Sequence, residues 1–124
     1  MKIIGKIDLN KIEKYRYKVV TDEVVLTDER KQHILNNHNK DYEKIIKNIN
    51  RVILNPREIL EDSKNINTLL FIDKLEKNNL NVIIRLNTIN NKKHPKNSVM
   101  TAWIIRDSNL IKLRKKNKII YKRE

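Results

Sequence analysis

The stretch "NTLLFIDKLEKNNLNVIIRLNTI", residues 67–89, decides how this chain folds. Two runs rich in Leu, Ile, Val and Phe stand on either side of "KNN", and a short apolar run bounded by turn-forming residues is typical of a buried strand. "REILED" (57–62) precedes this pair and "SVMTAWIIRD" (98–107) follows it, each across a break rich in Asn, Lys and Ser. We therefore expect a meander of four antiparallel strands in this part of the chain.

Two helices are expected ahead of the meander. Thr27 offers a hydroxyl that caps the first amides of a helix, and Asp28 and Glu29 favour the positive end of its dipole. This helix runs to about Asn37, where an Asn in the left-handed conformation would end it. The second helix is stopped by "LNP" (54–56), and its apolar stripe consists of Tyr42, Ile45, Ile46, Ile49 and Val52 or Ile53.

The two ends of the chain complete the expected fold. Runs rich in Val and Ile predict extended segments around residues 2–8 and 17–26, and the tail predicts a turn or short helix followed by a strand at about 118–122. The predicted class is α+β, with an N-terminal extended segment and two helices packed on a four-stranded antiparallel β-meander, and a short C-terminal strand. A chain of 124 residues with 39% hydrophobic content fits one domain, residues 1–124.

The composition excludes several classes of protein. Without cysteine the chain has no disulfide and no thiolate ligand, and its single glycine argues against Gly-rich phosphate loops. No apolar run approaches the roughly 18 to 20 residues that span a bilayer, and the N-terminus lacks the apolar region of a signal peptide. We expect a soluble protein that acts in the cytoplasm, with no cofactor and no membrane partner.

The charge is strongly basic. Lys and Arg total 28 against 15 for Asp and Glu, which gives a formal net charge of +13 and favours nucleic acid as the partner, with a membrane surface second. An A/T-biased genome, whose codons favour Lys, Asn and Ile, is the alternative, but it does not explain the clusters at 90–97 and 112–124. The residues expected to contact phosphates are Lys92, Lys93, Lys96, Lys112, Arg114, Lys115, Lys116 and Lys118.

Two of the three histidines, His33 and His38, lie in "RKQHILNNHN" (30–39). RNA cleavage without a metal needs a base, an acid and a cation at the phosphate, and histidine and arginine supply these near neutral pH. Residues five apart on one helix are about 140° apart, so both rings reach one site only if the helix ends before His38. The alternative is that His33 packs and His38 is a solvated cap. Zinc is disfavoured because the i, i+4 spacing and a third ligand are missing.

The other candidates lie on predicted strands or in the basic loop. Arg85 interrupts an apolar strand, so its side chain points either to solvent or into a cleft. Thr101 is either a strand former or a hydroxyl donor to a phosphate, and Tyr121 is either an edge aromatic or a group that stacks on a base. Trp103 is expected in the core and His94 on the surface.

Several fragments, taken in order, resemble the phage-associated branch of the barnase, EndoU, colicin and RelE-like (BECR-type) nucleases. These fragments are "VVLTDERKQHILNNH" (24–38), "RVILNPREILED" (51–62), "VIIRLNT" (82–88), "NSVMTAWII" (97–105) and "KIIYK" (118–122). The resemblance covers about residues 5–122 and implies a small metal-independent ribonuclease with a helical segment on a four-stranded antiparallel sheet. The family pattern falls on His33, His38, Arg85 and Thr101, and departs at Asn37, where an arginine is common.

Together these features predict an endoribonuclease of toxin, effector or phage-associated type. It would cleave RNA such as tRNA by 2′-OH transesterification, without a metal, and an antidote or immunity protein is a further expected partner. The predicted catalytic residues are His33, His38, Arg85, Thr101 and Tyr121. The alternatives are a non-catalytic RNA- or DNA-binding module and a structural accessory of a phage particle, both using the same basic surface.

Overall fold

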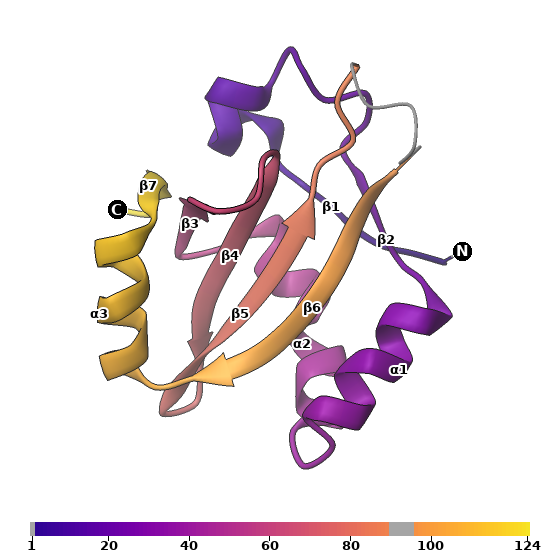
Figure 1. The fold of residues 1–124 in the computed structure, drawn as a ribbon, viewed down its shortest axis with the longest axis vertical. Helices are drawn as coiled ribbons and strands as arrows, with labels where there is room; N and C mark the ends of the chain where they lie inside the picture. The colour runs from indigo at the N-terminus through magenta and orange to yellow at the C-terminus, as the bar shows by residue number, and fades with distance from the viewer. Residues whose placement is uncertain (1, 90–95) are drawn as a thin grey trace.

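A computed structural model describes residues 2–89 and 96–124 and shows a mixed α+β fold (Figure 1). The chain begins with strand β1 (Lys2–Lys6), the 3-10 helix η1 (Leu9–Tyr15) and strand β2 (Glu23–Leu26). Helices α1 (Asp28–Asn37) and α2 (Tyr42–Leu54) follow. The second half contains β3 (Glu58–Glu61), β4 (Thr68–Leu75), β5 (Asn78–Arg85), β6 (Asn97–Ile105), α3 (Asp107–Lys116) and β7 (Lys118–Lys122).

One seven-stranded sheet, in the order β1-β2-β6-β5-β4-β3-β7, organises the molecule. The four strands β3 to β6 are antiparallel neighbours, as the apolar runs predict. The prediction of a four-stranded sheet is nevertheless wrong, because β2 adds in parallel to β6, β1 pairs with β2, and β7 pairs with β3. Both edges of the four strands are thereby extended, which satisfies backbone groups that a shorter sheet would leave unpaired.

Apolar side chains form a large core on one face of the sheet and a smaller cluster on the other. On the first face α2 lies behind the central strands in Figure 1, and its predicted stripe packs there, with Ile45, Ile49, Val52 and Ile53 fully buried. On the second face Leu110 of α3 joins the smaller cluster of strand residues. The fold has more helices than the two predicted to pack on the sheet: α3 lies where the tail predicted a turn or short helix, and η1 was not predicted.

Local signals explain where the helices begin and end. Thr27 caps α1 as expected, because its Oγ1 accepts a hydrogen bond from the Arg30 amide at 3.2 Å. The predicted left-handed Asn at the end of α1 is wrong: among the described residues φ is positive only at Asn67 and Glu76, and the cap is His38, with φ −139°. Helix α2 ends at Leu54, ahead of the proline.

The extended segment predicted at residues 17–26 is shorter in the structure. Only residues 23–26 form a strand, and Val19 makes an isolated bridge to Thr88. No helix in residues 2–89 or 96–124 has the length and apolar character needed to cross a bilayer.

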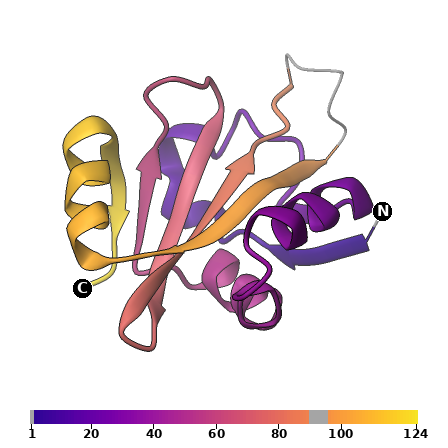
Figure 2. The ribbon, with the colours of Figure 1, turned by 60° about the horizontal axis from the view of Figure 1, so that its bottom comes forward.

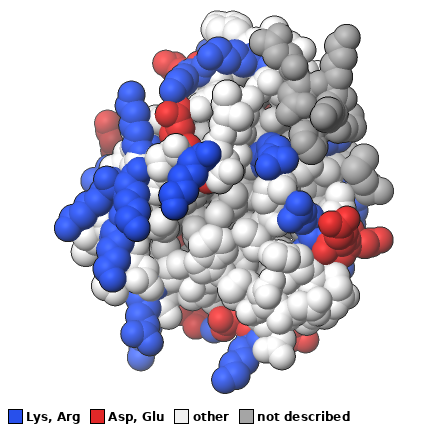
Figure 3. Space-filling view, viewed as in Figure 1, with Lys and Arg blue, Asp and Glu red and all other residues white. Residues whose placement is uncertain are grey.

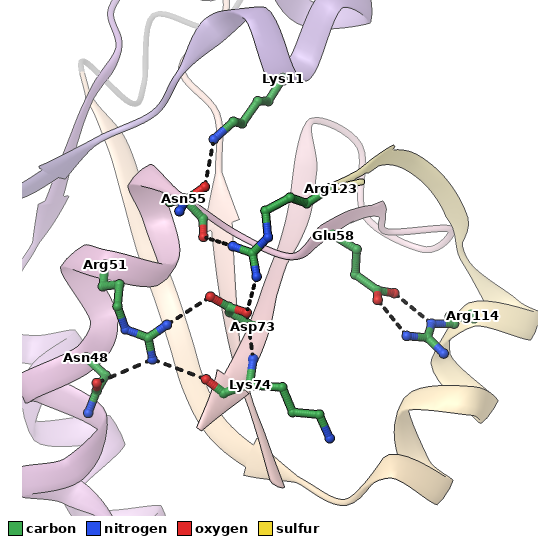
Figure 4. A network of polar contacts seen from close by, with 9 residues as sticks. All are labelled: Lys11, Asn48, Arg51, Asn55, Glu58, Asp73, Lys74, Arg114 and Arg123. Carbon is green, nitrogen blue, oxygen red and sulfur yellow. Dashed lines mark hydrogen bonds and ion pairs between the residues drawn. The ribbon is translucent and has the colours of Figure 1, made fainter. Parts of the chain in front are cut away.

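Buried carboxylates tie the helices and the C-terminus to the sheet (Figure 4). Asp73 of β4, 4% exposed, accepts hydrogen bonds from Arg51 of α2 at 2.8 Å and from Arg123 at 3.3 Å. Glu58 of β3, 1% exposed, accepts two from Arg114 of α3, at 2.8 and 2.6 Å. Between α3 and α1, one face of β5 and β6 has no helix over it (Figures 1 and 2).

Candidate active site

The open face of β5 and β6 carries two of the predicted catalytic residues. Strand pairing sets Ile83 opposite Thr101 and Arg85 opposite Ser98, and these side chains share one face because alternate residues point the same way. Their neighbours in sequence, such as Ile84 and Val99, are fully buried in the main core on the other face.

A β-bulge in β6 makes this arrangement possible. The register shifts between Ile83 and Ile84, so that Met100 is an extra residue between Val99 and Thr101. Without the shift, Ser98 and Thr101 would point to opposite faces, because they are three residues apart. The bulge therefore directs both hydroxyls to the open face, and bulges of this kind are common beside active sites.

His38 reaches the same face from the C-terminal end of helix α1. Strand β2 pairs with β6 only at Asn97 and Ser98, and α1 lies beside the later part of β6. At the C-terminal end of α1 the His38 ring stacks on the Trp103 ring, with centroids 6.2 Å apart and planes 20° apart. Since Trp103 is on the open face, this stack brings His38, Thr101 and Arg85 to one surface.

His33 is placed differently from His38. It is exposed on α1, and the Asn37 amide lies 3.3 Å from both of its ring nitrogens. The helix does end between the two histidines, as their convergence requires. The structure brings the His38 ring against the sheet and leaves the His33 ring on the outer part of the helix.

Tyr121 does not share the open face. It pairs with Ile59 on the other side of β3, packs against the main core, and has the Lys11 ammonium 5.5 Å from its ring centroid. Trp103, expected in the core, is instead partly exposed on the open face. His94 lies outside the described residues.

Two adjoining hollows lie on or beside this face. One, of about 250 Å³, is lined by residues that include Lys64, Asn81, Trp103 and Lys116. The other, of about 340 Å³, is lined by residues 64–67 and Arg85, so Lys64 borders both. A third hollow, of about 390 Å³ between β1, α1 and α2, contains none of the predicted site residues in its lining.

Some of the described basic side chains are held in structural ion pairs, and others are exposed on the surface. Figure 3 shows Lys and Arg side chains gathered over α3, beside a centre made largely of uncharged residues. Arg114 is engaged by Glu58, and the Lys96 ammonium lies 2.8 Å from Glu23, whose pKa it lowers. Lys92 and Lys93 lie outside the described residues, whereas the exposed members of the predicted set are Lys112, Lys115, Lys116 and Lys118.

A hydrogen-bonded group borders the loop between β3 and β4. The Lys14 ammonium lies 2.6 Å from the Glu61 carboxylate, which also accepts a hydrogen bond from the Tyr15 hydroxyl. These two donors lower the pKa of Glu61, while burial and the bond to Glu61 raise the pKa of Tyr15.

Within residues 2–89 and 96–124, no three His, Asp or Glu side chains are grouped as a metal site requires.

Sequence reasoning missed three residues of this face: Lys64, Asn81 and Trp103. The alternation in "SVMTAWII" places Trp103 on the same side as Thr101, which was a usable signal. Asn81 is a polar residue inside an apolar strand, as Arg85 is, and the same argument applied to it. Lys64 lies in a loop, where no periodic pattern marks it.

A family model described as phage-Barnase-EndoU-ColicinE5/D-RelE like nuclease2 matches residues 1–122. The chain belongs to this phage-associated nuclease family, and that membership suggests nuclease activity. No curated protein and no solved structure gives a significant match.

Proposed function

We propose that the protein is a metal-independent endoribonuclease that cleaves RNA by attack of a 2′-hydroxyl on the adjacent phosphate. The observation that carries this proposal is that Thr101 and Arg85 share one open sheet face, against which the His38 ring stacks on Trp103. A proton-transfer group, a hydroxyl donor and a cation are the parts that this chemistry needs.

Each residue has a distinct role in the proposed reaction. His38 transfers a proton to or from a reacting oxygen, and the stack on Trp103 holds its ring in place. The Arg85 guanidinium and the Thr101 hydroxyl bind the nonbridging oxygens on which charge builds. His33, which is exposed near the end of α1, is the proposed second proton-transfer group, because imidazole transfers protons near neutral pH.

The basic surface supports RNA as the substrate. The formal net charge of +13 and the exposed lysines of α3 favour a polyanion, and the partly exposed Trp103 ring offers a stacking surface for an unpaired base. We further propose structured RNA such as tRNA as the target, action in the cytoplasm as a toxin or effector, and an antidote protein as a partner.

A second function, a binding module for RNA or DNA without catalysis, is favoured by one observation. The exposed lysines on α3 bind phosphates whether or not His38 reacts. A structural accessory of a phage particle would use the same lysines.

The test is incubation of the purified protein with total RNA in EDTA, followed by analysis of the product ends. We expect cleavage with 2′,3′-cyclic phosphate and 5′-hydroxyl ends, and no cleavage where the attacking 2′-hydroxyl is replaced by hydrogen. Gln32→Ala, an exposed change on α1, is the matched control and leaves cleavage intact. Activity that disappears in EDTA and returns with Mg²⁺ would replace this mechanism with a metal-dependent one.

A further inference from the structure

The least satisfied side chain on the open face is that of Asn81. It is 0% exposed, and neither its Nδ2 nor its Oδ1 has a hydrogen-bond partner among residues 2–89 and 96–124. A buried amide without partners is costly, and buried polar groups are nearly always paired. Asn81 therefore has a donor and an acceptor that remain available for a ligand.

The surroundings of Asn81 have the shape and chemistry of a site for a planar heterocycle. Asn81 contributes to the hollow of about 250 Å³, together with the Trp103 ring and apolar side chains of the strands and α3. Lys64 and Lys116 add positive charge at the same hollow. An aromatic wall, a buried amide and nearby cations match a base, its polar edge and its phosphate.

The loop that borders this hollow is fixed by hydrogen bonds. The Ser63 amide donates to Asn117 Oδ1 of the α3 cap at 2.9 Å, which ties the loop to the end of the helix. The Asp62 carboxylate accepts from the Lys64 amide at 2.8 Å and from the Asn65 side chain at 3.0 Å. The border of the hollow is therefore pre-organised, which lowers the entropy cost of binding.

Position along β5 relates this hollow to the proposed reaction centre. Asn81 and Arg85 are on the same face, with Ile83 between them, so the two positions are about 13 Å apart along the strand. Lys64 borders the hollows of both residues. An RNA strand whose phosphate is bound at Arg85 can therefore direct the base of a neighbouring nucleotide toward Asn81.

We propose that Asn81 and Trp103 form a subsite that binds one unpaired nucleobase of the substrate, with the amide pairing to the base edge and the indole stacking on its face. This inference rests on the proposed function, which supplies RNA as the ligand. Because neighbouring side chains cover the amide, a base enters when the long Lys116 side chain at the hollow rotates aside.

Fluorescence titration tests the subsite directly, because Trp103 is the only tryptophan of the chain. The probes are the four nucleoside 3′-monophosphates, with ribose 5-phosphate as a ligand that has phosphate and no base. We expect at least one nucleotide to quench Trp103 and shift the Asn81 side-chain amide resonances, and ribose 5-phosphate to do neither. Equal responses to nucleotides and to ribose 5-phosphate would overturn the proposal.

Substitution of the amide provides the second arm. Asn81→Leu keeps the approximate size and removes both polar atoms, so we expect the affinity for the preferred nucleotide to fall at least tenfold while the fold is retained. Asn10→Leu, an exposed change in η1, is the control and leaves the affinity unchanged. Circular dichroism checks that the variants are folded, and Asn81→Ser is used if the leucine variant is not.

The outcomes separate this inference from the proposed function. Nucleotide binding that depends on Asn81 supports the subsite even if RNA is not cleaved, and that result would reject only the proposed catalysis. Unchanged nucleotide affinity in a folded Asn81→Leu variant overturns the subsite even if RNA is cleaved. In an active enzyme we also expect Asn81→Leu to cleave at more kinds of nucleotide than the unsubstituted protein.

Discussion

Arg85 and Thr101 point to the open face because side chains alternate between the two faces of a strand. His38 reaches this face because it is the residue that caps the end of α1. The stack on Trp103 holds the imidazole, whereas Arg85 projects from a central strand whose neighbours are buried. Rigid strands position functional groups more accurately than loops do, which favours this face as a reaction centre.

At this scale Arg85→Lys separates charge from geometry. An ammonium keeps the positive charge and loses the planar fork, so we expect kcat to fall about tenfold or more while the affinity for RNA changes little. Steady-state kinetics measures the effect, and Arg16→Lys, an exposed change after η1, is the control. Equal activity of Arg85→Lys and the unsubstituted protein would remove Arg85 from the proposed mechanism.

Some residues of this face could be predicted from the sequence and others could not. Arg85 and Thr101 were identifiable because a charge and a hydroxyl interrupt apolar strands, and the structure does bring them to one face. The partner of His38 was not identifiable, since the Trp103 stack joins two residues that are distant in sequence. Tyr121 also lies in a predicted strand, but it packs against the main core, on the other face of the sheet.

At the scale of elements, α3 is held by one buried ion pair as well as by Leu110. Arg114→Met leaves the Glu58 carboxylate buried without its cation, a change that typically costs roughly 3 to 5 kcal/mol. We expect the lower end of that range, because the Arg114 side chain is 32% exposed and partly screened. Urea denaturation measures the loss, and Glu58→Gln combined with Arg114→Met should recover part of it. A loss below about 0.5 kcal/mol, the size of an ordinary surface change, would show that the pair does not anchor α3.

The contact between η1 and β3 predicts a pH dependence of stability. Hydrogen bonds from Lys14 and Tyr15 lower the pKa of Glu61 in the folded protein. The stabilisation is therefore present above the pKa of Glu61 in the unfolded chain, and it is lost as pH falls through the lower folded value. We expect the melting temperature of Glu61→Gln to fall less steeply on acidification than that of the unsubstituted protein. Parallel curves for the two proteins would contradict this assignment.

Most strands and the helices α1 and α2 were predictable from the sequence, but the pairing of the outer strands was not. The helices and the four strands from β3 to β6 have strong apolar periodicity, and their bounds lie close to the expected ones. The parallel addition of β2 to β6 depends on a contact across more than 70 residues, which no local pattern encodes. Helix η1 lies between the two predicted extended segments and was not predicted. It is a short 3-10 helix with only two buried residues, Ile12 and Tyr15, so it has no long apolar periodicity.

At the scale of the whole molecule, the net charge of +13 governs association with nucleic acid. Binding that releases counterions weakens linearly in log[salt], with a slope of about −0.7 per phosphate contact on single strands. We expect RNA affinity to fall steeply between low and moderate salt, as fluorescence anisotropy would measure. Affinity that does not change with salt would contradict a phosphate-binding surface.

The lysines at the end of α3 and the start of β7 are expected to contribute to this charge effect. Reversing Lys115, Lys116 and Lys118 to Glu lowers the formal net charge by 6, so binding should weaken by a similar factor for RNAs of different sequence. Competition binding with several RNAs measures this. A loss confined to one sequence would mean that these residues read bases.

The most direct test of the account compares the single-turnover cleavage rate of one RNA, in EDTA, by the unsubstituted protein and by His38→Ala. The account predicts a rate lower by about 10² to 10⁴ in the variant, the usual contribution of one proton-transfer group. It also predicts that RNA affinity and the circular dichroism spectrum stay nearly the same. A folded His38→Ala variant that cleaves the RNA at the original rate would contradict the account.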